Sequence, residues 1–349
     1  MSPASVDTAA GLLSAMMRIP ELQTDIELAY LAEGGANIVY RMVMPESCRA
    51  KKETETEWQH TYGGRLLRLR KKIGSGTPYI ETAINFDSQI KALFHDSELV
   101  EQTLVALPKD IVSVCNAQLE SDEASGRRPK GRRGGYLSLK EPFGLLITDM
   151  SPSPNSGASL WEFKPKWLLQ SPSAPPNAKR CRTCALREMK NFYACQRGEK
   201  TSRAFCPLDL VSSDFDDVLR AVRLMKGPQH ERSRLAKFLH QHPTLLKLRD
   251  CQILKNAVGL PGLCADSRER AVSMTIRDCT MFVRVPRDER ETPEVRLGDL
   301  DFKSGTGGKL EYWRDLETRL IEEGWYHGRE AVAEMPDCSL QYRRQRTPA

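Results

Sequence analysis

Two aspartates near the C-terminal end of the sequence have the spacing to act together on one cation. Asp278 lies in the β-prone run 273–286 (SMTIRDCTMFVRVP), Asp299 lies in the run 293–302 (PEVRLGDLDF), and the polar segment RDERET lies between the two runs. In an antiparallel hairpin, residues equidistant from the turn face each other, and the midpoint of this pair falls inside the polar segment. Two facing carboxylates repel each other unless a cation lies between them, and a divalent metal is the usual one. The alternative is an ordinary ion pair for each aspartate, with Arg277, Arg296 or Lys303.

A second stretch, LWEFKPKW at 160–167, could supply ligands for phosphate groups. Alternation along a strand places Glu162, Lys164 and Lys166 on one face. Two lysines and a carboxylate beside tryptophans suit phosphate oxygens better than they suit a core. The alternative is the solvated face of an edge strand.

Four cysteines predict a metal site. Cys181 and Cys184 are separated by two residues, and Cys195 and Cys206 follow in a region otherwise typical of loops. Four thiolates are a common ligand set for structural zinc. The alternative is a group of buried, reduced thiols.

The stretch LAEGGANIVYR at 31–41 places Gly34 and Gly35 between two β-prone runs, with Ala36 and Asn37 behind them. Gly and Asn tolerate the positive φ angles of a hairpin turn, so a plain turn explains the pattern. The alternative is close approach of the backbone to a ligand such as a nucleotide phosphate. The stretch is neither a spaced dinucleotide-binding fingerprint nor a Walker A loop.

Size and composition indicate a globular protein of two lobes. The chain has 349 residues, with 52 Lys+Arg against 46 Asp+Glu. No apolar run reaches the roughly 18 residues of a membrane span, and no secretory signal is recognisable. We therefore expect a cytosolic or nuclear protein with reduced or metal-bound cysteines. Basic runs at 65–72, 127–133 and 179–187 favour an anionic partner, either nucleic acid or a small polyphosphate, although each alone could be a solvated surface.

The periodicity of the sequence predicts an α+β fold. The predicted strands are Asn37–Met44, Gly64–Arg70 and Leu145–Asp149, and residues 88–107 favour helix. The predicted helices of the second half are Leu208–Lys226, Glu231–Arg249 and Lys309–Glu323. A charged, Gly-rich segment at 121–135 predicts a mobile loop, and a Pro/Ser/Gly stretch near 150 predicts a linker. A small β-rich lobe over 1–150 would thus precede a larger mixed lobe over 151–349.

The order of these features is that of a kinase. A glycine turn, a strand cation at Arg68, a linker, an IRD element and a DLD element follow one another. Protein kinases place a glycine loop, a strand cation, a catalytic aspartate and a metal-binding aspartate in the same order. The usual HRD and DFG are absent, and Val283 stands where the kinase Asn would be. This is not an ordinary protein kinase.

With these residues assembled, the chain resembles the inositol-pentakisphosphate 2-kinase family, and the fungal members most closely. The resemblance extends from about residue 30 to 325 and rests on EGGANIVYR, LLRLRK, EFKPKW, CRTC, FCPLDL, IRDCTMFV and DLDFKS, in that order. It implies a two-lobed, kinase-like fold and synthesis of phytate from ATP, with Mg²⁺, and inositol 1,3,4,5,6-pentakisphosphate. Residues 1–150 would bind the nucleotide, and residues 151–349 would bind the inositol phosphate and carry out catalysis.

The resemblance also implies roles for single residues. Asp278 would accept the proton of the reacting hydroxyl, Asp299 would hold Mg²⁺, and Lys164 would offset charge on the transferred phosphoryl group. The residues implied in nucleotide binding are Glu33, Gly34, Gly35, Ala36, Asn37, Arg68 and Asp149. Those implied in substrate binding are Arg128, Lys164, Lys166, Arg182, Lys190, Lys303, Lys309 and Tyr312.

Two departures from the family pattern stand out. Leu186 occupies a position where the plant pattern has histidine, and the neighbouring Arg187 is the candidate to replace it. The zinc ligands of the plant members have no counterparts here.

The sequence therefore predicts an ATP- and Mg²⁺-dependent inositol-pentakisphosphate 2-kinase that carries a possible structural zinc. We expect a monomer that binds a soluble inositol polyphosphate, with no membrane partner; nucleic acid is not favoured. The alternatives are a kinase for another inositol polyphosphate and a non-catalytic binder of polyanions. Aspartates in the site argue against the binder, because they would weaken its hold on an anion.

Overall fold

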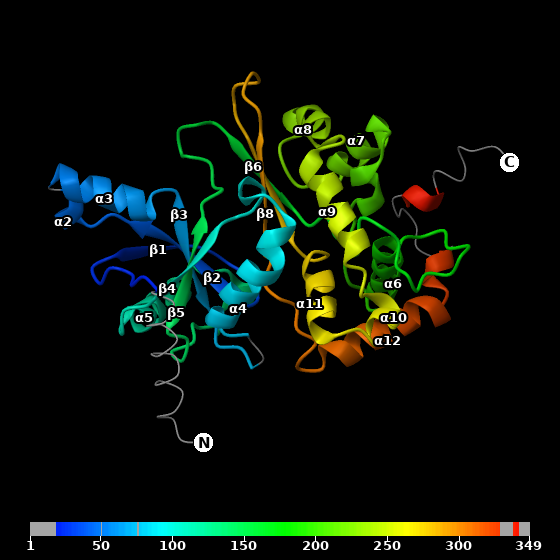
Figure 1. Ribbon diagram of the computed structural model, residues 1–349, viewed down its shortest axis with the longest axis horizontal. Coiled ribbons are helices and arrows are strands. Elements are labelled where there is room, and N and C mark those ends of the chain that lie inside the picture. The colour runs from blue at the N-terminus through cyan, green and yellow to red at the C-terminus, as the bar shows by residue number, and fades with distance from the viewer. Residues whose placement is uncertain (1–18, 50, 75–76, 329–337, 342–349) are drawn as a thin grey trace. The chain divides into compact units, whose positions relative to one another are not determined.

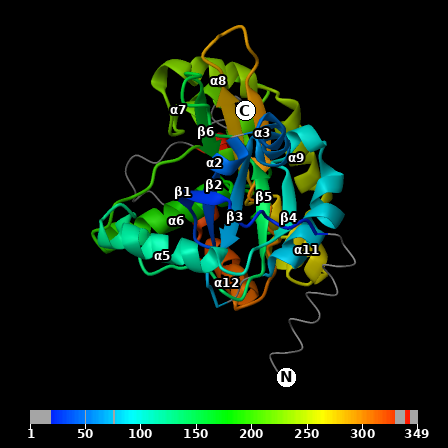
Figure 2. The same ribbon diagram turned by 90° about the vertical axis from the view of Figure 1, so that its left-hand side faces the viewer.

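The computed structural model describes residues 19–49, 51–74, 77–328 and 338–341. Within these residues the chain forms two compact units, drawn in Figures 1 and 2. Unit 1 runs to Asn85 and also holds Val100–Asp149, whereas unit 2 holds Phe86–Leu99 and the chain from Met150 onward. Residues 86–99 were predicted to be part of the first lobe. These residues belong to unit 2 because Phe86, Ile90 and Leu99 are buried in the hydrophobic core of that unit.

Unit 1 is built on a five-stranded antiparallel sheet in the order β1-β2-β3-β5-β4. Its strands are β1 (Glu27–Glu33), β2 (Asn37–Val43), β3 (Arg65–Arg70), β4 (Gln102–Ala106) and β5 (Phe143–Thr148). Its helices are α2 (Glu46–Arg49), α3 (Lys52–Tyr62), α4 (Tyr79–Asn85) and α5 (Ile111–Ala124). Alternation in β2 buries Ile38, Tyr40 and Met42 against the core. The three predicted strands of this half are confirmed to within two residues at each end.

Unit 2 combines a three-stranded antiparallel sheet, ordered β6-β7-β8, with seven described helices. The strands are β6 (Ser159–Phe163), β7 (Thr280–Val285) and β8 (Glu294–Gly298). The helices are α6 (Arg182–Gln196), α7 (Phe215–Arg223), α8 (Arg232–Leu239), α9 (Pro243–Leu254), α10 (Gly259–Gly262), α11 (Ser267–Thr275) and α12 (Lys309–Glu322). Trp161, Val283 and Leu297 bring one strand each into a core shared with α7, α8 and α9. The mixture of helices and antiparallel sheets confirms the predicted α+β class.

Four predicted elements were wrong in part. The predicted helix Leu208–Lys226 is a 3-10 turn, Pro207–Val211, followed by α7. Residues 273–275 end helix α11 instead of starting a strand, because the Asp266 side chain caps that helix by accepting from the N–H groups of Arg268 and Glu269. The predicted helix over 88–107 is short helical turns followed by β4. The predicted helix Glu231–Arg249 is broken between α8 and α9, where Gln241 has a φ of 55° and Pro243 begins the next helix.

The segment 121–135 is not the predicted loop throughout. Its first residues finish α5, and Lys130–Arg132 forms a 3-10 turn. Among the described residues, no helix combines the length and the apolar content that crossing a bilayer requires.

Candidate functional site

The candidate active site lies at one end of the β6-β7-β8 sheet. Lys164 directly follows β6, Asp278 precedes β7 by two residues, and Asp299 directly follows β8. Because neighbouring strands are antiparallel, the end of β6, the start of β7 and the end of β8 meet at the same edge. The pairing of Thr280 with Gly298 confirms the predicted hairpin, with a register one residue away from the predicted one. The sequence pattern therefore placed the two aspartates together correctly.

A lysine lies between the two carboxylates. The Lys164 Nζ is 2.6 Å from Oδ2 of Asp299 and 3.5 Å from Oδ1 of Asp278, and it donates to the Asp278 carbonyl at 2.8 Å. Lys166 contacts Oδ1 of Asp278 at 2.7 Å, and Lys303 contacts Oδ2 at 3.3 Å. Of the three ion-pair partners considered from the sequence, Lys303 is therefore the one in place. Arg296 pairs with Glu294 instead.

These contacts fix the charge states of the site. Burial alone would raise the pKa of Asp278, but the ammonium groups of Lys166, Lys303 and Lys164 lower it to about 2. Burial would lower the pKa of Lys164, and the two aspartates, Asp299 first, raise it instead. At neutral pH the site thus holds an ionised Asp278 surrounded by charged lysines.

Two site residues have backbone conformations that side-chain-bearing residues seldom adopt. Lys166 has a φ of 61° and Asp299 a φ of 53°, in the left-handed region. The carbonyl of Lys166 accepts from Nε2 of the buried Gln252 at 2.9 Å, which holds this turn in place. Such strain is typical of functional sites, where the surrounding structure over-determines the conformation. The left-handed backbone of Lys166, which follows the end of β6 at Phe163, directs its side chain toward Asp278.

The lysines open onto a strongly basic cavity of about 790 Å³ within unit 2. Among the described residues that line it, eight are basic and Asp278 alone is acidic. The basic ones are Lys164, Lys166, Arg182, Arg187, Lys190, Arg277, Lys303 and Lys309. Tyr312, 54% exposed, lines the cavity as well. Seven of the eight substrate ligands implied by the resemblance are thus brought together, and Arg128 is the exception.

Stacked arginines support the cavity wall. The Arg182 guanidinium lies 4.2 Å from the ring centre of Trp167, and that of Arg277 lies 5.1 Å from it. Arg182 also binds Glu317 at 2.7 Å. Arg277 donates instead to the carbonyl oxygens of Lys255, Ser273 and Gln252 and to Oδ1 of Asn256.

The sequence analysis missed Arg277 and Trp167 as wall residues. Burial, and then the nearby Arg182, lower the pKa of Arg277 to about 9. The signal for Arg277 was its place directly before Asp278 in the IRD element. Nothing in the sequence indicated that two guanidinium groups stack on the aromatic ring of Trp167.

The residue proposed to replace the missing histidine is otherwise engaged. Arg187 lines the cavity, but its two terminal nitrogens donate to the carbonyl oxygens of Ala204 and Phe205. The positive charge of Arg187 therefore contributes to the cavity, whereas its hydrogen bonds stabilise the loop that precedes Pro207. Leu186 also lines the cavity.

In unit 1, the glycine turn joins β1 to β2, and the Gly34 N–H donates to the Asn37 carbonyl at 2.9 Å. Neither Gly34 nor Gly35 has the positive φ that the hairpin interpretation required. A Cβ added at either would meet no protein atom within 4 Å. Neither backbone strain nor packing within the described protein therefore requires glycine at these positions.

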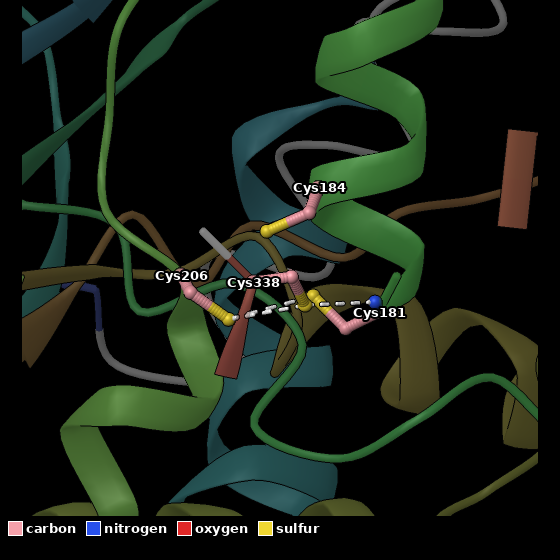
Figure 3. A group of neighbouring side chains, drawn as sticks. All are labelled: Cys181, Cys184, Cys206 and Cys338. Atoms are coloured by element: carbon pink, nitrogen blue, oxygen red, sulfur yellow. Dashed lines mark hydrogen bonds between the residues drawn. The ribbon is translucent and has the colours of Figure 1, made fainter. Parts of the chain in front are cut away.

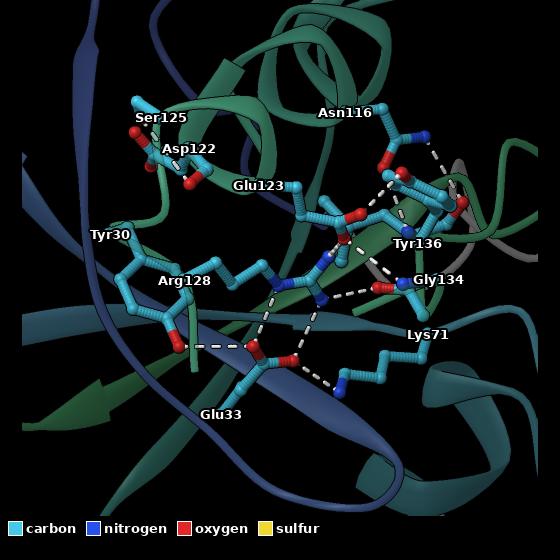
Figure 4. Close-up of polar contacts among 12 residues, drawn as sticks. Tyr30, Glu33, Lys71, Asn116, Asp122, Glu123, Ser125, Arg128, Gly134 and Tyr136 are labelled. Atoms are coloured by element: carbon cyan, nitrogen blue, oxygen red, sulfur yellow. Dashed lines mark hydrogen bonds and ion pairs between the residues drawn. The ribbon is translucent and has the colours of Figure 1, made fainter. Parts of the chain in front are cut away.

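The base of this turn is fixed by a buried ionic cluster, shown in Figure 4. Arg128 binds Glu33 through Nε at 2.8 Å and Nη2 at 2.9 Å, and it also pairs with Glu123. Lys71 pairs with Glu33 as well and donates to the Gly34 carbonyl at 2.9 Å. Burial would raise the pKa of Glu33, but Arg128 and Lys71 lower it to about 2. Glu33 thus holds the glycine turn in place through these ion pairs.

Arg128 departs from the sequence-based expectation. We expected it on a flexible, empty loop, but its side chain is 1% exposed and its guanidinium is enclosed by two carboxylates. A run of like charges predicts a solvated loop only if no oppositely charged residue from another part of the chain pairs with it. Here Glu33, 95 positions away in the sequence, brings Arg128 into the interior.

The other residues implied in nucleotide binding frame the same sheet. Arg68 is buried on β3, with its guanidinium 5.5 Å from the ring of Tyr79. The hydroxyl of Tyr79 donates to Oδ1 of Asn37 at 3.0 Å, and the Ala36 carbonyl accepts from the N–H of Lys71. Asp149, the last residue of unit 1, donates its N–H to the Gly64 carbonyl at 2.8 Å.

Four cysteines of unit 2 lie close enough to hold one metal ion: Cys181, Cys184, Cys206 and Cys338 (Figure 3). The prediction named Cys195 in place of Cys338. Cys195 is exposed, and it is 11 residues beyond Cys184 on the same helix, which is about 16 Å at 1.5 Å per residue. A helix cannot return such a residue to its own first turn, so the inclusion of Cys195 was wrong.

Comparison of the sequence with known proteins identifies its family. A family model described as inositol-pentakisphosphate 2-kinase matches residues 30–231 and 228–319. The chain belongs to the inositol-pentakisphosphate 2-kinase family. Membership of this family makes it an enzyme, and it confirms the resemblance seen in the sequence.

Three relatives carry the family's name. The protein from Yarrowia lipolytica is 34% identical over 211 residues, which are 54% of this chain and 67% of that protein. The Eremothecium gossypii protein is 29% identical over 170 residues, 47% of this chain and 54% of its own length. The Debaryomyces hansenii protein is 23% identical over 340 residues, 77% and 78% of the two chains. The chain thus spans between about half and four fifths of these relatives.

Proposed function

We propose that this protein transfers the γ-phosphoryl group of ATP to the 2-hydroxyl of inositol 1,3,4,5,6-pentakisphosphate and so forms inositol hexakisphosphate. One observation carries the proposal: eight basic side chains and Asp278 line one cavity, in a member of a family named for this activity. Each phosphate carries about −1.5 to −2 charges, so the substrate carries on the order of ten. A cavity with one acidic and eight basic side chains suits such an anion.

Asp278 is the group we assign to the reacting hydroxyl. It is ionised at neutral pH, its side chain is 39% exposed, and its two oxygens are approached by different lysines. A carboxylate of low pKa is a weak base, so its main work is to orient the hydroxyl and to receive the proton late in the transfer. This fits phosphoryl transfer, in which positioning and charge stabilisation dominate.

Lys164 and Asp299 would meet the nucleotide phosphates. Mg²⁺ is usually held by one or two carboxylates together with substrate phosphates, and the half-buried Asp299 fits that role. When bound, the metal would neutralise charge on the nucleotide phosphates. Lys164, 2.6 Å from Asp299, is placed to stabilise the group in transfer once Asp299 is engaged elsewhere.

The glycine turn supports a nucleotide-binding role for unit 1. A Cβ at Gly34 or Gly35 would meet open space, so the described protein leaves room for a ligand beside these two residues. Backbone N–H groups without a Cβ in the way can approach phosphate oxygens closely. Glu33, Lys71 and Arg128 would hold the turn ready for that contact.

ADP release in the presence of Mg²⁺-ATP tests the proposal directly. It should depend on inositol pentakisphosphate, with little release for an inositol tetrakisphosphate, for inositol hexakisphosphate or without an acceptor. Rapid turnover of another inositol phosphate instead would make the protein a kinase of different specificity. Tight binding of the polyphosphates with no ADP release would make it a binder of polyanions.

A further inference from the structure

The four-cysteine cluster is placed on three segments that lie far apart in the sequence. Cys181 is the N-cap of α6, and Cys184 lies in the first turn of that helix. Cys206 precedes the 3-10 turn Pro207–Val211, and Cys338 belongs to the described residues 338–341. All four side chains are at most 2% exposed. Figure 3 shows their sulfur atoms converging on one point from these segments.

The distances between the sulfur atoms are those of a tetrahedral metal site. Cys206 Sγ is 3.8 Å from Cys181 Sγ and 3.8 Å from Cys338 Sγ, and the four sulfur atoms all lie within 4.8 Å of one another. A Zn–S bond is about 2.3 Å, and the edge of a tetrahedron with that radius is about 3.8 Å. A disulfide would instead bring two sulfur atoms to about 2.05 Å.

The surroundings also favour a metal-bound state. The N–H of Cys181 donates to Cys338 Sγ at 3.1 Å, a contact that suits a sulfur carrying negative charge. Leu208 and Leu340 pack against the cluster and help to keep water away. Zinc binding would displace a proton from each thiol, and the 2+ charge of the ion would offset half of the charge of the four thiolates.

We propose that Cys181, Cys184, Cys206 and Cys338 bind one structural zinc ion. The ion fastens residues near the C-terminal end of the described chain to the start of α6. Cys338 lies 19 positions beyond residue 319, where the family match ends, so this fastening uses a residue outside the matched region.

The site has a consequence for the cavity. Arg182 directly follows the ligand Cys181 and stacks on Trp167 in the cavity wall, and Pro207, directly after the ligand Cys206, lines the same cavity. Zinc would therefore fix both ends of the wall that carries Arg182 and Arg187. Its role would be to position these residues, without contact to the substrate.

Metal analysis of the full-length protein, purified without added zinc, tests the proposal. We expect about one zinc per chain, retained in Cys195→Ser and Cys264→Ser, two exposed cysteines that serve as matched controls. Cys338→Ser should lose most of the zinc and unfold at a temperature lower by on the order of 5 °C, because zinc binding stabilises the folded state.

A measurement on the unaltered protein protects the test from a variant that fails to fold. An organomercurial that reacts with thiolates should release one zinc per chain, read with a chromogenic zinc indicator. Cobalt-substituted protein should show the visible absorption of tetrahedral cobalt with thiolate ligands. Three results would each overturn the proposal. One is a protein whose thermal stability is the same with and without metal, and another is a protein that contains iron in place of zinc. The third is a Cys338→Ser variant that keeps its full zinc.

Discussion

Replacing Asp278 with Asn removes one charge and leaves the shape of the side chain almost unchanged. In the structure its carboxylate contacts Lys166 at 2.7 Å, Lys303 at 3.3 Å and Lys164 at 3.5 Å. The amide oxygen can still accept from Lys166 or from Lys303 but not from both, because the amide NH2 group only donates, and the amide cannot take up the proton of the substrate hydroxyl. The variant therefore separates proton acceptance from the architecture of the site.

The size of the effect follows from the contacts. Positioned proton acceptors contribute about 10²- to 10⁴-fold to rate, or about 3–5 kcal/mol of barrier. The side chain is 39% exposed, so each of the three ion pairs contributes only about 0.2–1 kcal/mol to folding. We expect Asp278→Asn to lower kcat by at least about 100-fold and to reduce the free energy of unfolding by about 1–2 kcal/mol.

Binding should move in the opposite direction to rate. Asp278 is the one acidic residue among the described residues that line the cavity, so its removal leaves eight basic residues facing the polyphosphate. The Kd of inositol pentakisphosphate, measured by calorimetry without ATP, should be unchanged or lower. A variant that keeps near-normal kcat, or one that loses turnover only because it no longer binds the inositol phosphate, would refute the role assigned to Asp278.

Three further predictions use the same assays. Asp299→Asn should raise the KM for Mg²⁺-ATP at least tenfold while the Kd of inositol pentakisphosphate stays within about twofold, because the lost carboxylate is a metal ligand; equal losses for both ligands would contradict this assignment. Gly35→Ala should leave the thermal unfolding temperature unchanged, since its Cβ would meet no protein atom. The same change should raise the KM for ATP by about tenfold, or about 1.4 kcal/mol. A destabilised protein with a normal KM would show that the glycine serves the fold. Arg128→Ala should cost about 3–5 kcal/mol of stability by leaving the buried Glu33 with only Lys71 and the Tyr30 hydroxyl as partners, whereas Arg127→Ala, at a 66% exposed side chain, should cost under about 1 kcal/mol. Because the pKa of Glu33 is lowered to about 2, its contribution is complete above its unfolded pKa near 4 and is lost as the pH falls toward 2, so Arg128→Ala should also flatten the acid limb of the stability curve.

Much of the catalytic edge could be predicted because it depends on local order. β7 and β8 are joined by a short polar turn, so Asp278 and Asp299 had to lie near each other. In unit 1, β2 alternates in burial, whereas β3 and β5 are buried along most of their length. The start of β7 was misplaced because the β-branched Thr275 and Ile276 favour a strand. The Asp266 cap and the tertiary contacts of α11 overrode that preference.

What could not be predicted depends on contacts between distant residues. Cys338 lies beside Cys206 across 132 positions, and Cys195 was the nearer candidate because the region after Cys184 was expected to be a loop, whereas it is helix α6. Arg128 is buried because Glu33 and Glu123 surround it, which a basic run does not reveal. The left-handed backbone at Lys166 is likewise imposed by the surrounding fold.

The position of the new phosphate is the most direct test of the central proposal. Inositol pentakisphosphate labelled for NMR should be incubated with Mg²⁺-ATP and the purified protein, and the product analysed by phosphorus–proton correlation. The proposal predicts one new phosphate monoester on the axial 2-oxygen, formed by the unaltered protein and at least about 100-fold more slowly by Asp278→Asn. A pyrophosphate on an existing phosphate, or no product with folded protein, would contradict it.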